Sequence, residues 1–169
     1  MRAFKQTFAL PSLEQTSALA RNLAAAVAEY QRLYPAAFLP VVLLMGDLGA
    51  GKTTFIRFLT ETLPGGENAE VASPSFTLCN VYHTTPKVQH FDLYRLPPGS
   101  GDEMLEESLE ELCGLILIEW AEYLPGRVFP VDRIEMYWHV HKDSRKVVFE
   151  GSGAGKALLE LIALKPADK

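Results

Sequence analysis

The eight residues from Gly46 to Thr53 constrain this chain most, because they match the pattern G-x-x-x-x-G-K-[ST] of a phosphate-binding loop. Such a loop works between a buried strand and a helix. Both flanks fit: residues 41–45 are an apolar run typical of a buried parallel strand, and residues 53–63 place their apolar side chains near one helical face. The octet therefore predicts an α/β domain that binds a nucleoside triphosphate.

The residue types of the octet explain this chemistry. Glycines lack a Cβ atom, so the loop can curl with several backbone N–H groups pointing at phosphate oxygens. We expect Lys52 to be an exposed ligand group for the β- and γ-phosphates and Thr53 to offer its hydroxyl to Mg²⁺. The start of the following helix adds its positive dipole end. The alternative is a Gly-rich turn that binds nothing.

Length and charge limit what else the chain can be. Its 169 residues suit one compact core, so we predict a single P-loop ATPase domain over residues 1–169. No apolar run approaches the ~18 residues of a membrane span, and residues 1–6 lack the apolar centre of a signal peptide, which predicts a cytoplasmic protein without a membrane partner. The net charge of -5 argues against tight autonomous binding to nucleic acid.

The order of the expected elements predicts the fold. Helix-flanked strands at the front and a hairpin near the end indicate an α/β, three-layer, P-loop NTPase-like domain. Its sheet should be mixed, with a parallel centre and a C-terminal antiparallel hairpin toward one side. We expect helices over residues 12–33, 53–63, 102–112 and 156–164, and strands over 41–45, 71–82, 88–92, 115–118, 134–141 and 145–150, with Asp143 and Ser144 in the hairpin turn.

Two patterns in the C-terminal third have simple interpretations. Ile134, Met136, Trp138 and Val140 alternate with polar residues and should share one buried face. The Gly-rich run over residues 151–156 superficially resembles a second phosphate loop, but its spacing is too short and no hydroxyl follows the lysine, so we expect a plain turn.

Two carboxylates stand where a phosphate loop needs one, at the end of a buried strand. Asp92 closes the strand over residues 88–92, and Glu119 follows the more apolar strand over 115–118. We assign Glu119 to the metal side for that reason. His139 and His141 also share a strand face, but no third ligand accompanies them, so we expect a solvent-facing pair.

Absent motifs narrow the nucleotide chemistry. The chain has no N-K-x-D to bind guanine, which favours ATP over GTP. A small-molecule kinase would bring an Arg-rich lid, whereas the arginines here are scattered and only Arg57 and Arg95 are expected near the loop.

Four blocks of residues together resemble one family. The octet extended to Phe55, then SPSFTL over residues 73–78, HFDLYRL over 90–96 and IEW over 118–120 are similar to the bacterial TsaE ATPases, once named YjeE, and follow the order found in that family. The blocks span residues 46–120. TsaE proteins support synthesis of threonylcarbamoyladenosine (t6A) beside the anticodon of tRNAs that read codons beginning with A.

The resemblance implies partners and site residues. It implies work with the TsaD and TsaB proteins, contact with tRNA only through their complex, and ATP and Mg²⁺ as cofactors. It assigns ATP binding to residues 48–54 and to Leu13 and Arg145, and switch-like behaviour near the γ-phosphate to the 73–77 segment. In full, the implied residues are Leu48, Gly49, Ala50, Gly51, Lys52, Thr53, Thr54, Leu13 and Arg145 for ATP; Thr53 and Glu119 for Mg²⁺; Lys52, Asp92 and Glu119 for catalysis; and Ser73, Ser75 and Thr77 for the switch-like segment.

The sequence thus favours an ATP-hydrolysing accessory protein of tRNA modification. Two alternatives stay open: a small-molecule kinase, which would transfer the phosphoryl group to a metabolite, and a regulatory binding module, which would assemble with ATP and barely hydrolyse it.

Overall fold

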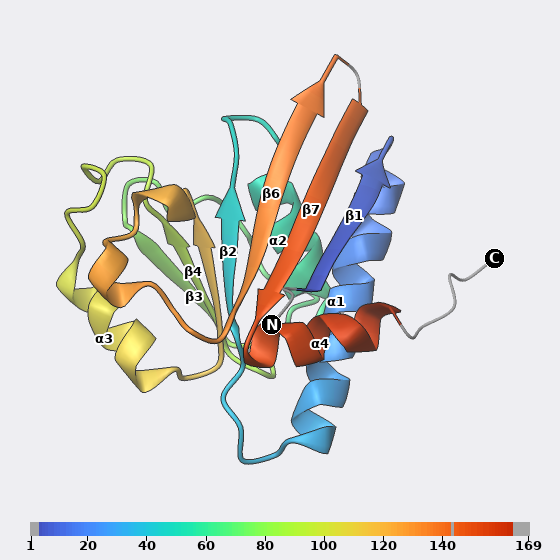
Figure 1. The fold of residues 1–169 in the computed structure, drawn as a ribbon, viewed down its shortest axis with the longest axis horizontal. Helices are drawn as coiled ribbons and strands as arrows, with labels where there is room; N and C mark the ends of the chain where they lie inside the picture. Colours follow the sequence, from blue (N-terminus) through green and yellow to red (C-terminus); the bar gives the residue numbers. More distant parts are fainter. Residues whose placement is uncertain (1–3, 143, 164–169) are drawn as a thin grey trace.

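The computed structural model describes residues 4–142 and 144–163, in which a seven-stranded sheet lies between two layers of helices (Figure 1). The elements follow one another as β1 (Phe4–Leu10), α1 (Leu13–Leu33), β2 (Val41–Met45), α2 (Lys52–Thr62), β3 (Cys79–Tyr82), β4 (Val88–Asp92), α3 (Glu103–Glu111), β5 (Leu115–Glu119), the short 3₁₀ turns η1 (Ala121–Tyr123) and η2 (Gly126–Val128), β6 (Arg133–His141), β7 (Ser144–Ser152) and α4 (Ala154–Ala163).

The sheet is parallel at its centre and antiparallel at both edges. Its strand order is β1-β7-β6-β2-β5-β4-β3. Strand β2 pairs in parallel with β5 and β6, and β5 pairs in parallel with β4. Strands β7 and β1 continue one edge antiparallel, and β3 runs antiparallel to β4 at the other. The predicted three-layer mixed sheet is confirmed, and β3 adds a second antiparallel edge to the one expected.

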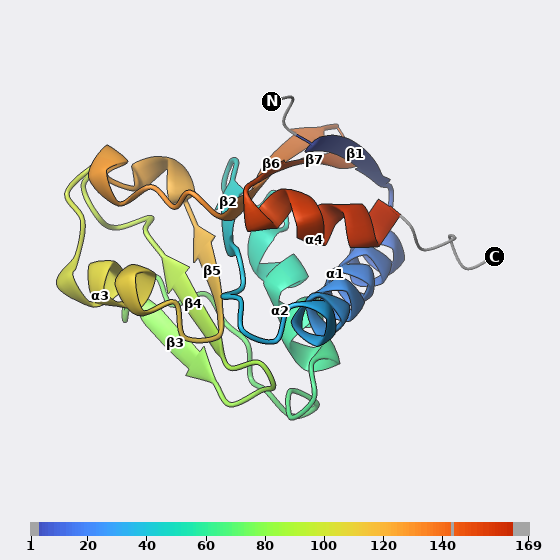
Figure 2. The ribbon, with the colours of Figure 1, turned by 60° about the horizontal axis from the view of Figure 1, so that its bottom comes forward.

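Both faces of the central strands are covered. Val42 and Leu44 belong to the hydrophobic cluster under α1, α2 and α4, whereas Val41 and Leu43 belong to the cluster under α3. Figure 2 shows α3 on one side of the sheet and the other three helices on the opposite side. This two-sided burial explains why β2 is apolar throughout rather than alternating.

Helix α1 follows its apolar spacing. Leu19, Leu23 and Val27 are buried, and the helix ends at Leu33, as predicted. At its start, the hydroxyl of the N-cap Ser12 contacts the side chain of Gln15 and not a backbone N–H group. None of the helices in the described residues is long and apolar enough to cross a membrane.

The strand predicted over residues 71–82 is wrong for its first part, since only Cys79–Tyr82 forms β3. Residues 71–78 run as an irregular segment with a turn. Pro74 has no N–H to donate to a ladder, and the hydroxyl of Ser73 contacts Asp92, so tertiary contacts replace strand pairing here. Leu78 then has a φ of 68°, outside the β region.

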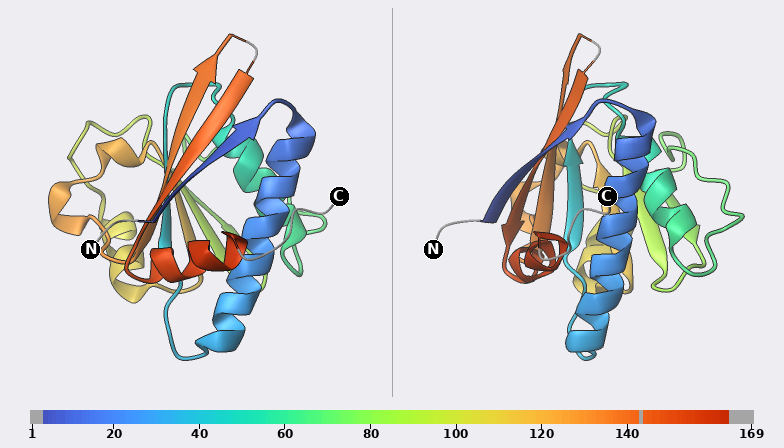
Figure 3. Two further views of the ribbon diagram at one scale, coloured as in Figure 1. Left: turned by 45° about the vertical axis from the view of Figure 1, so that its right-hand side comes forward. Right: turned by 90° about the vertical axis from the view of Figure 1, so that its right-hand side faces the viewer.

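The C-terminal hairpin extends past the helix layer, as Figure 3 shows. Ile134, Met136 and Trp138 are buried as predicted, but Val140 is 49% exposed because it lies near the projecting end. Two expected positions, Asp143 in the turn and the helix end at residue 164, lie outside the described residues. Strand β1 was not expected; it pairs with β7 along its length.

Candidate nucleotide-binding site

The octet forms a loop between β2 and α2 whose backbone requires glycine at two positions. Gly46 has a φ of 131°, and a Cβ atom there would lie 2.6 Å from the carbonyl oxygen of Trp138. Gly51 is the N-cap of α2 in a left-handed conformation, with a φ of 111°. No side chain caps this helix start, so the first N–H groups of α2 are available to an anion.

Lys52 is buried, which corrects the expectation of an exposed side chain. It is 4% exposed, and its Nζ donates hydrogen bonds to the carbonyl oxygens of Gly46 and of Asp47, the latter at 2.9 Å. The ring of Trp120 lies 4.3 Å from Nζ. Burial lowers the pKa of Lys52, and the neighbouring carboxylates, Glu119 foremost, oppose that shift. The cation is held within the loop by the loop's own carbonyl groups.

The two strand-end carboxylates lie beside this loop. Asp92 and Glu119 are paired across β4 and β5, and both side chains are buried. Thr53 Oγ1 donates to Glu119 Oε1 at 2.7 Å. Asp92 accepts from the hydroxyl of Ser73 and, at 2.9 Å, from the backbone N–H of Tyr94. Each carboxylate is therefore fixed by a different set of donors.

A cleft of about 190 Å³ brings most of the predicted residues together. An adjoining hollow of about 70 Å³ brings Leu13 and Arg145 against the octet, the side on which the family resemblance expects the nucleotide. The cleft is lined by Leu48, Gly49, Ala50, Gly51, Lys52, Thr53, Thr54, Ser73, Asp92, Glu119 and Trp120, and the hollow by Leu13, Thr16, Gly49, Gly51, Thr54 and Arg145.

Four residues that were expected near the cleft do not line it. Ser75 and Thr77 lie in the turn that precedes β3, where the Thr77 hydroxyl contacts Asn80. Arg57 lies 4.0 Å from Glu61 on α2, and Arg95 stacks on Phe76 with its guanidinium 4.0 Å from the ring. The two arginines thus have other partners.

Two residues of the site were given no role from the sequence. His90 is fully buried, and its Nε2 lies 2.8 Å from Glu119 Oε1. Its position two residues before Asp92 on one strand puts both side chains on the same face, which is a usable signal. Trp120 covers Lys52 from a left-handed backbone with a φ of 57°, and nothing in the sequence pattern indicates that conformation.

The histidine pair and the second Gly-rich run considered in the sequence lie outside the cleft. His139 and His141 are exposed, as expected. The Gly-rich run over residues 151–156 contains the end of β7, a turn at Gly153 alone and the start of α4, so the turn is shorter than expected. There the carboxylate of Asp132 accepts a hydrogen bond from the Ala154 N–H at 2.7 Å, so a side chain already occupies the anion position of that helix start.

The oxygen ligands at the cleft suit Mg²⁺. The Thr53 hydroxyl and the Glu119 carboxylate are hard donors that already contact one another. Among the residues that the structure describes, no three His, Cys, Asp or Glu side chains could hold a metal ion together. A Mg²⁺ ion at Thr53 and Glu119 would therefore share its coordination with the phosphates, which is the usual arrangement for this ion.

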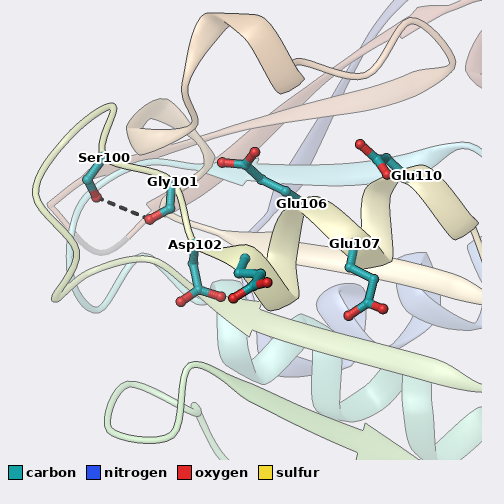
Figure 4. A pocket seen from close by; sticks show the side chains of 7 residues that line it. Ser100, Gly101, Asp102, Glu106, Glu107 and Glu110 are labelled. Carbon is teal, nitrogen blue, oxygen red and sulfur yellow. Dashed lines mark hydrogen bonds between the residues drawn. The ribbon is translucent and has the colours of Figure 1, made fainter.

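A more open hollow of about 630 Å³ lies beside α3, and Figure 4 shows its carboxylates. Asp102 caps the helix there by accepting from the N–H groups of Met104 and Leu105. The ionisable side chains that line this hollow are all acidic, so it would repel a triphosphate. The octet is the better anion site.

Known proteins resemble this chain over most of its length. The sequence profile of the family described as "Threonylcarbamoyl adenosine biosynthesis protein TsaE" matches residues 10–159, which include the octet and both strand-end carboxylates. The chain belongs to the TsaE family. Proteins named as tRNA threonylcarbamoyladenosine biosynthesis protein TsaE in Rickettsia felis and Aquifex aeolicus are 42% and 39% identical to it, over 69% and 63% of this chain.

A solved structure has the same fold as this chain. The crystal structure of Bacillus subtilis YdiB superposes with a TM-score of 0.69 and 26% sequence identity, and the match covers 96% of this chain and 97% of that one. The sequence matches cover 63% of the length of the Rickettsia felis relative and 74% of the Aquifex aeolicus relative.

Proposed function

We propose that this member of the TsaE family is a Mg²⁺-dependent ATPase that supports t6A modification of tRNA together with TsaD and TsaB. The observation that carries the proposal is the hydrogen bond from Thr53 to Glu119 inside the cleft formed by the phosphate-loop octet. It joins the first turn of α2 to the end of β5, where ATP-hydrolysing loops need a hydroxyl and a carboxylate together. We place this work in the cytoplasm.

The octet would bind the triphosphate. The N–H groups of the loop and of the first turn of α2 would donate to phosphate oxygens, and Lys52 would exchange its bonds to the carbonyl groups of Gly46 and Asp47 for bonds to phosphate. Trp120 would keep water away from the Lys52 ammonium group. Leu13 and Arg145 would contact the nucleotide from the adjoining hollow.

The carboxylates would divide the work of hydrolysis. Thr53 and Glu119 would hold Mg²⁺, which neutralises charge that develops on the phosphate oxygens. Asp92 is held by the hydroxyl of Ser73 and the N–H of Tyr94, so its carboxylate is restrained within the cleft. We assign Asp92 to orienting the attacking water and accepting its proton.

The kinase alternative would need an arginine at the cleft to clamp a transferred phosphoryl group. Arg57 and Arg95 contact other side chains, and Arg145 lines only the adjoining hollow. No observation among the described residues favours the kinase over the ATPase.

Two measurements test the proposal. Purified protein is incubated with ATP, with and without Mg²⁺, and free phosphate is followed over time. The protein is then used to capture TsaD and TsaB with and without ATP. We expect slow Mg²⁺-dependent phosphate release and ATP-dependent capture. Phosphoryl transfer to a metabolite without phosphate release would support the kinase, and capture without hydrolysis would support the binding module.

A further inference from the structure

The buried histidine beneath the site is the least explained group in it. His90 lies in β4 with no exposed surface, and Glu119 beside it is 3% exposed. Their closest polar atoms, His90 Nε2 and Glu119 Oε1, are 2.8 Å apart. A fully buried polar pair at the floor of a nucleotide cleft is costly unless its hydrogen bonds are made, so this contact has structural or functional consequences.

The contact defines which ring nitrogen carries hydrogen. A carboxylate only accepts hydrogen bonds, so the hydrogen of this bond must be on Nε2. The other ring nitrogen, Nδ1, is buried and has no hydrogen-bond partner among the described residues. A buried N–H without an acceptor is rarer in proteins than an acceptor without a donor. Both observations favour the ring form with hydrogen on Nε2 and none on Nδ1.

One oxygen of Glu119 receives both donors. Oε1 accepts from His90 Nε2 and, at 2.7 Å, from Thr53 Oγ1. No described residue donates a hydrogen bond to the second oxygen, Oε2. Two donors from β4 and α2 therefore fix the carboxylate through one oxygen and leave the other without a protein partner.

We propose that His90 is a positioning residue of the nucleotide site: its Nε2–H holds Glu119 in the orientation in which Thr53 and Glu119 together can serve Mg²⁺. The proposal rests on the proposed function and adds a residue to it. Side chains that orient a metal-binding carboxylate affect metal affinity by about 10- to 100-fold when they are removed. A histidine that only fills space would have no such effect.

Three substitutions separate these roles. His90→Gln can place its amide N–H near the Nε2 position, His90→Asn carries the same amide on a shorter side chain, and His90→Leu has no donor. We expect the Mg²⁺ concentration for half-maximal ATP hydrolysis to rise about 10- to 100-fold in the Leu and Asn variants and much less in the Gln variant. ATP binding measured without Mg²⁺ should be the same in all three.

A second background tests whether the effect passes through Glu119. In a Glu119→Gln protein the carboxylate is already lost, so adding His90→Leu should cause little further change in Mg²⁺ dependence. Equal shifts in both backgrounds would mean that His90 acts through packing, and they would overturn the proposal. Wild-type Mg²⁺ dependence in the His90→Leu variant would overturn it too.

An independent readout needs neither ATP nor metal. Two-bond ¹H–¹⁵N NMR spectra of the folded protein report which ring nitrogen of each histidine carries hydrogen, and a His90→Gln spectrum assigns the signal. We expect hydrogen on Nε2 and an unprotonated Nδ1. Hydrogen on Nδ1 would contradict the proposed bond. A wild-type protein that fails to hydrolyse ATP would count against the proposed function, while this spectrum would still decide the assignment for His90.

Discussion

Asp92 and Glu119 lie directly opposite each other on the neighbouring parallel strands β4 and β5, yet their carboxylates contact different parts of the molecule. Glu119 contacts Thr53 on α2, and Asp92 contacts Ser73 in the irregular segment before β3. Two carboxylates at the carboxyl ends of neighbouring strands thus contact two separate parts of the chain. Their substitutions should have separable effects.

Replacement of each carboxylate by its amide tests this separation. Glu119→Gln should raise the Mg²⁺ requirement because it weakens the proposed metal ligand, whereas Asp92→Asn should slow hydrolysis by about 10²- to 10⁴-fold with ATP still bound, because it removes the proposed proton acceptor. ATP binding and turnover are measured across a Mg²⁺ titration. If both variants behave like the wild type, neither carboxylate belongs to the site.

Lys52→Ala should abolish most ATP binding, because the only cation within the octet is removed. Since Lys52 is buried against Trp120, we also expect a small loss of thermal stability rather than none. Calorimetry measures binding and circular dichroism measures unfolding. Lys156→Ala, in the first turn of α4, is the matched control and should bind ATP normally. Normal ATP binding by folded Lys52→Ala protein would refute the phosphate-loop assignment.

Two glycines of the octet should differ in their tolerance of alanine. Both have positive φ, 131° at Gly46 and 76° at Gly49, but a Cβ at Gly46 would meet the Trp138 carbonyl oxygen while one at Gly49 would meet nothing within 4 Å. Gly49→Ala should cost about 1–2 kcal/mol of folding free energy from backbone strain alone. Gly46→Ala should cost more. Urea unfolding of both variants decides, and equal losses would contradict the observed close approach.

Alkaline stability should depend on Tyr137. Burial raises its pKa from 10.0 to about 12, and the hydrogen bond to Glu135 adds to the shift. The folded state therefore holds the phenol proton more tightly than the unfolded chain does. This contribution is complete below about pH 10 and is lost as the pH rises from 10.0 to about 12.

The Tyr137→Phe variant tests the contribution, because it has no proton to lose. Its unfolding free energy should fall less steeply than that of the wild type over that alkaline range, as measured by urea unfolding at several pH values. Burial also raises the pKa of Cys79, from 9.0 to about 11. Because Cys79 is present in both proteins, its contribution to the pH dependence cancels when the two are compared. If the unfolding free energies of the two proteins fall with the same slope against pH, Tyr137 does not contribute to alkaline stability.

Local patterns predicted the centre of the fold and of the site. The apolar runs that became β2 and β5 are buried on both faces, so their composition alone indicated strands, and the octet and Glu119 follow directly from them. Strand β1 pairs with β7, at the other end of the chain, and no local pattern reports so distant a partner. Strand β1 was therefore not predicted.

The side-chain environments were harder to predict than the elements. The burial of Lys52 depends on Trp120, and the buried contact of His90 depends on Glu119 from another strand. Such contacts form only after distant segments meet. The segment over residues 71–78 was wrongly predicted as a strand for the same reason. The contact of Ser73 with Asp92 joins two separate segments, and no local sequence pattern indicates it.

The cleft has an exposed rim, which leads to the prediction about partners. Leu48, which lines it, is 75% exposed. Bulk water in an open site weakens the electrostatic interactions that stabilise the reacting phosphate. Such a site therefore hydrolyses ATP poorly until another surface closes over it. The net charge of -5 also leaves little counterion release to gain from RNA. Alone, the protein should therefore turn over ATP slowly and bind tRNA weakly.

Addition of TsaD with TsaB should raise ATP turnover and allow repeated rounds of threonylcarbamoylation on a tRNA that reads codons beginning with A. The measurement is product formed over many turnovers, with the wild type compared against Lys52→Ala and against a reaction without this protein. Because Lys52 is the triphosphate ligand in the proposed site, the variant should support at most the product formed without any added protein. Equal product in all three reactions would remove the accessory ATPase role, and phosphoryl transfer to a small metabolite would then become the better explanation of the octet.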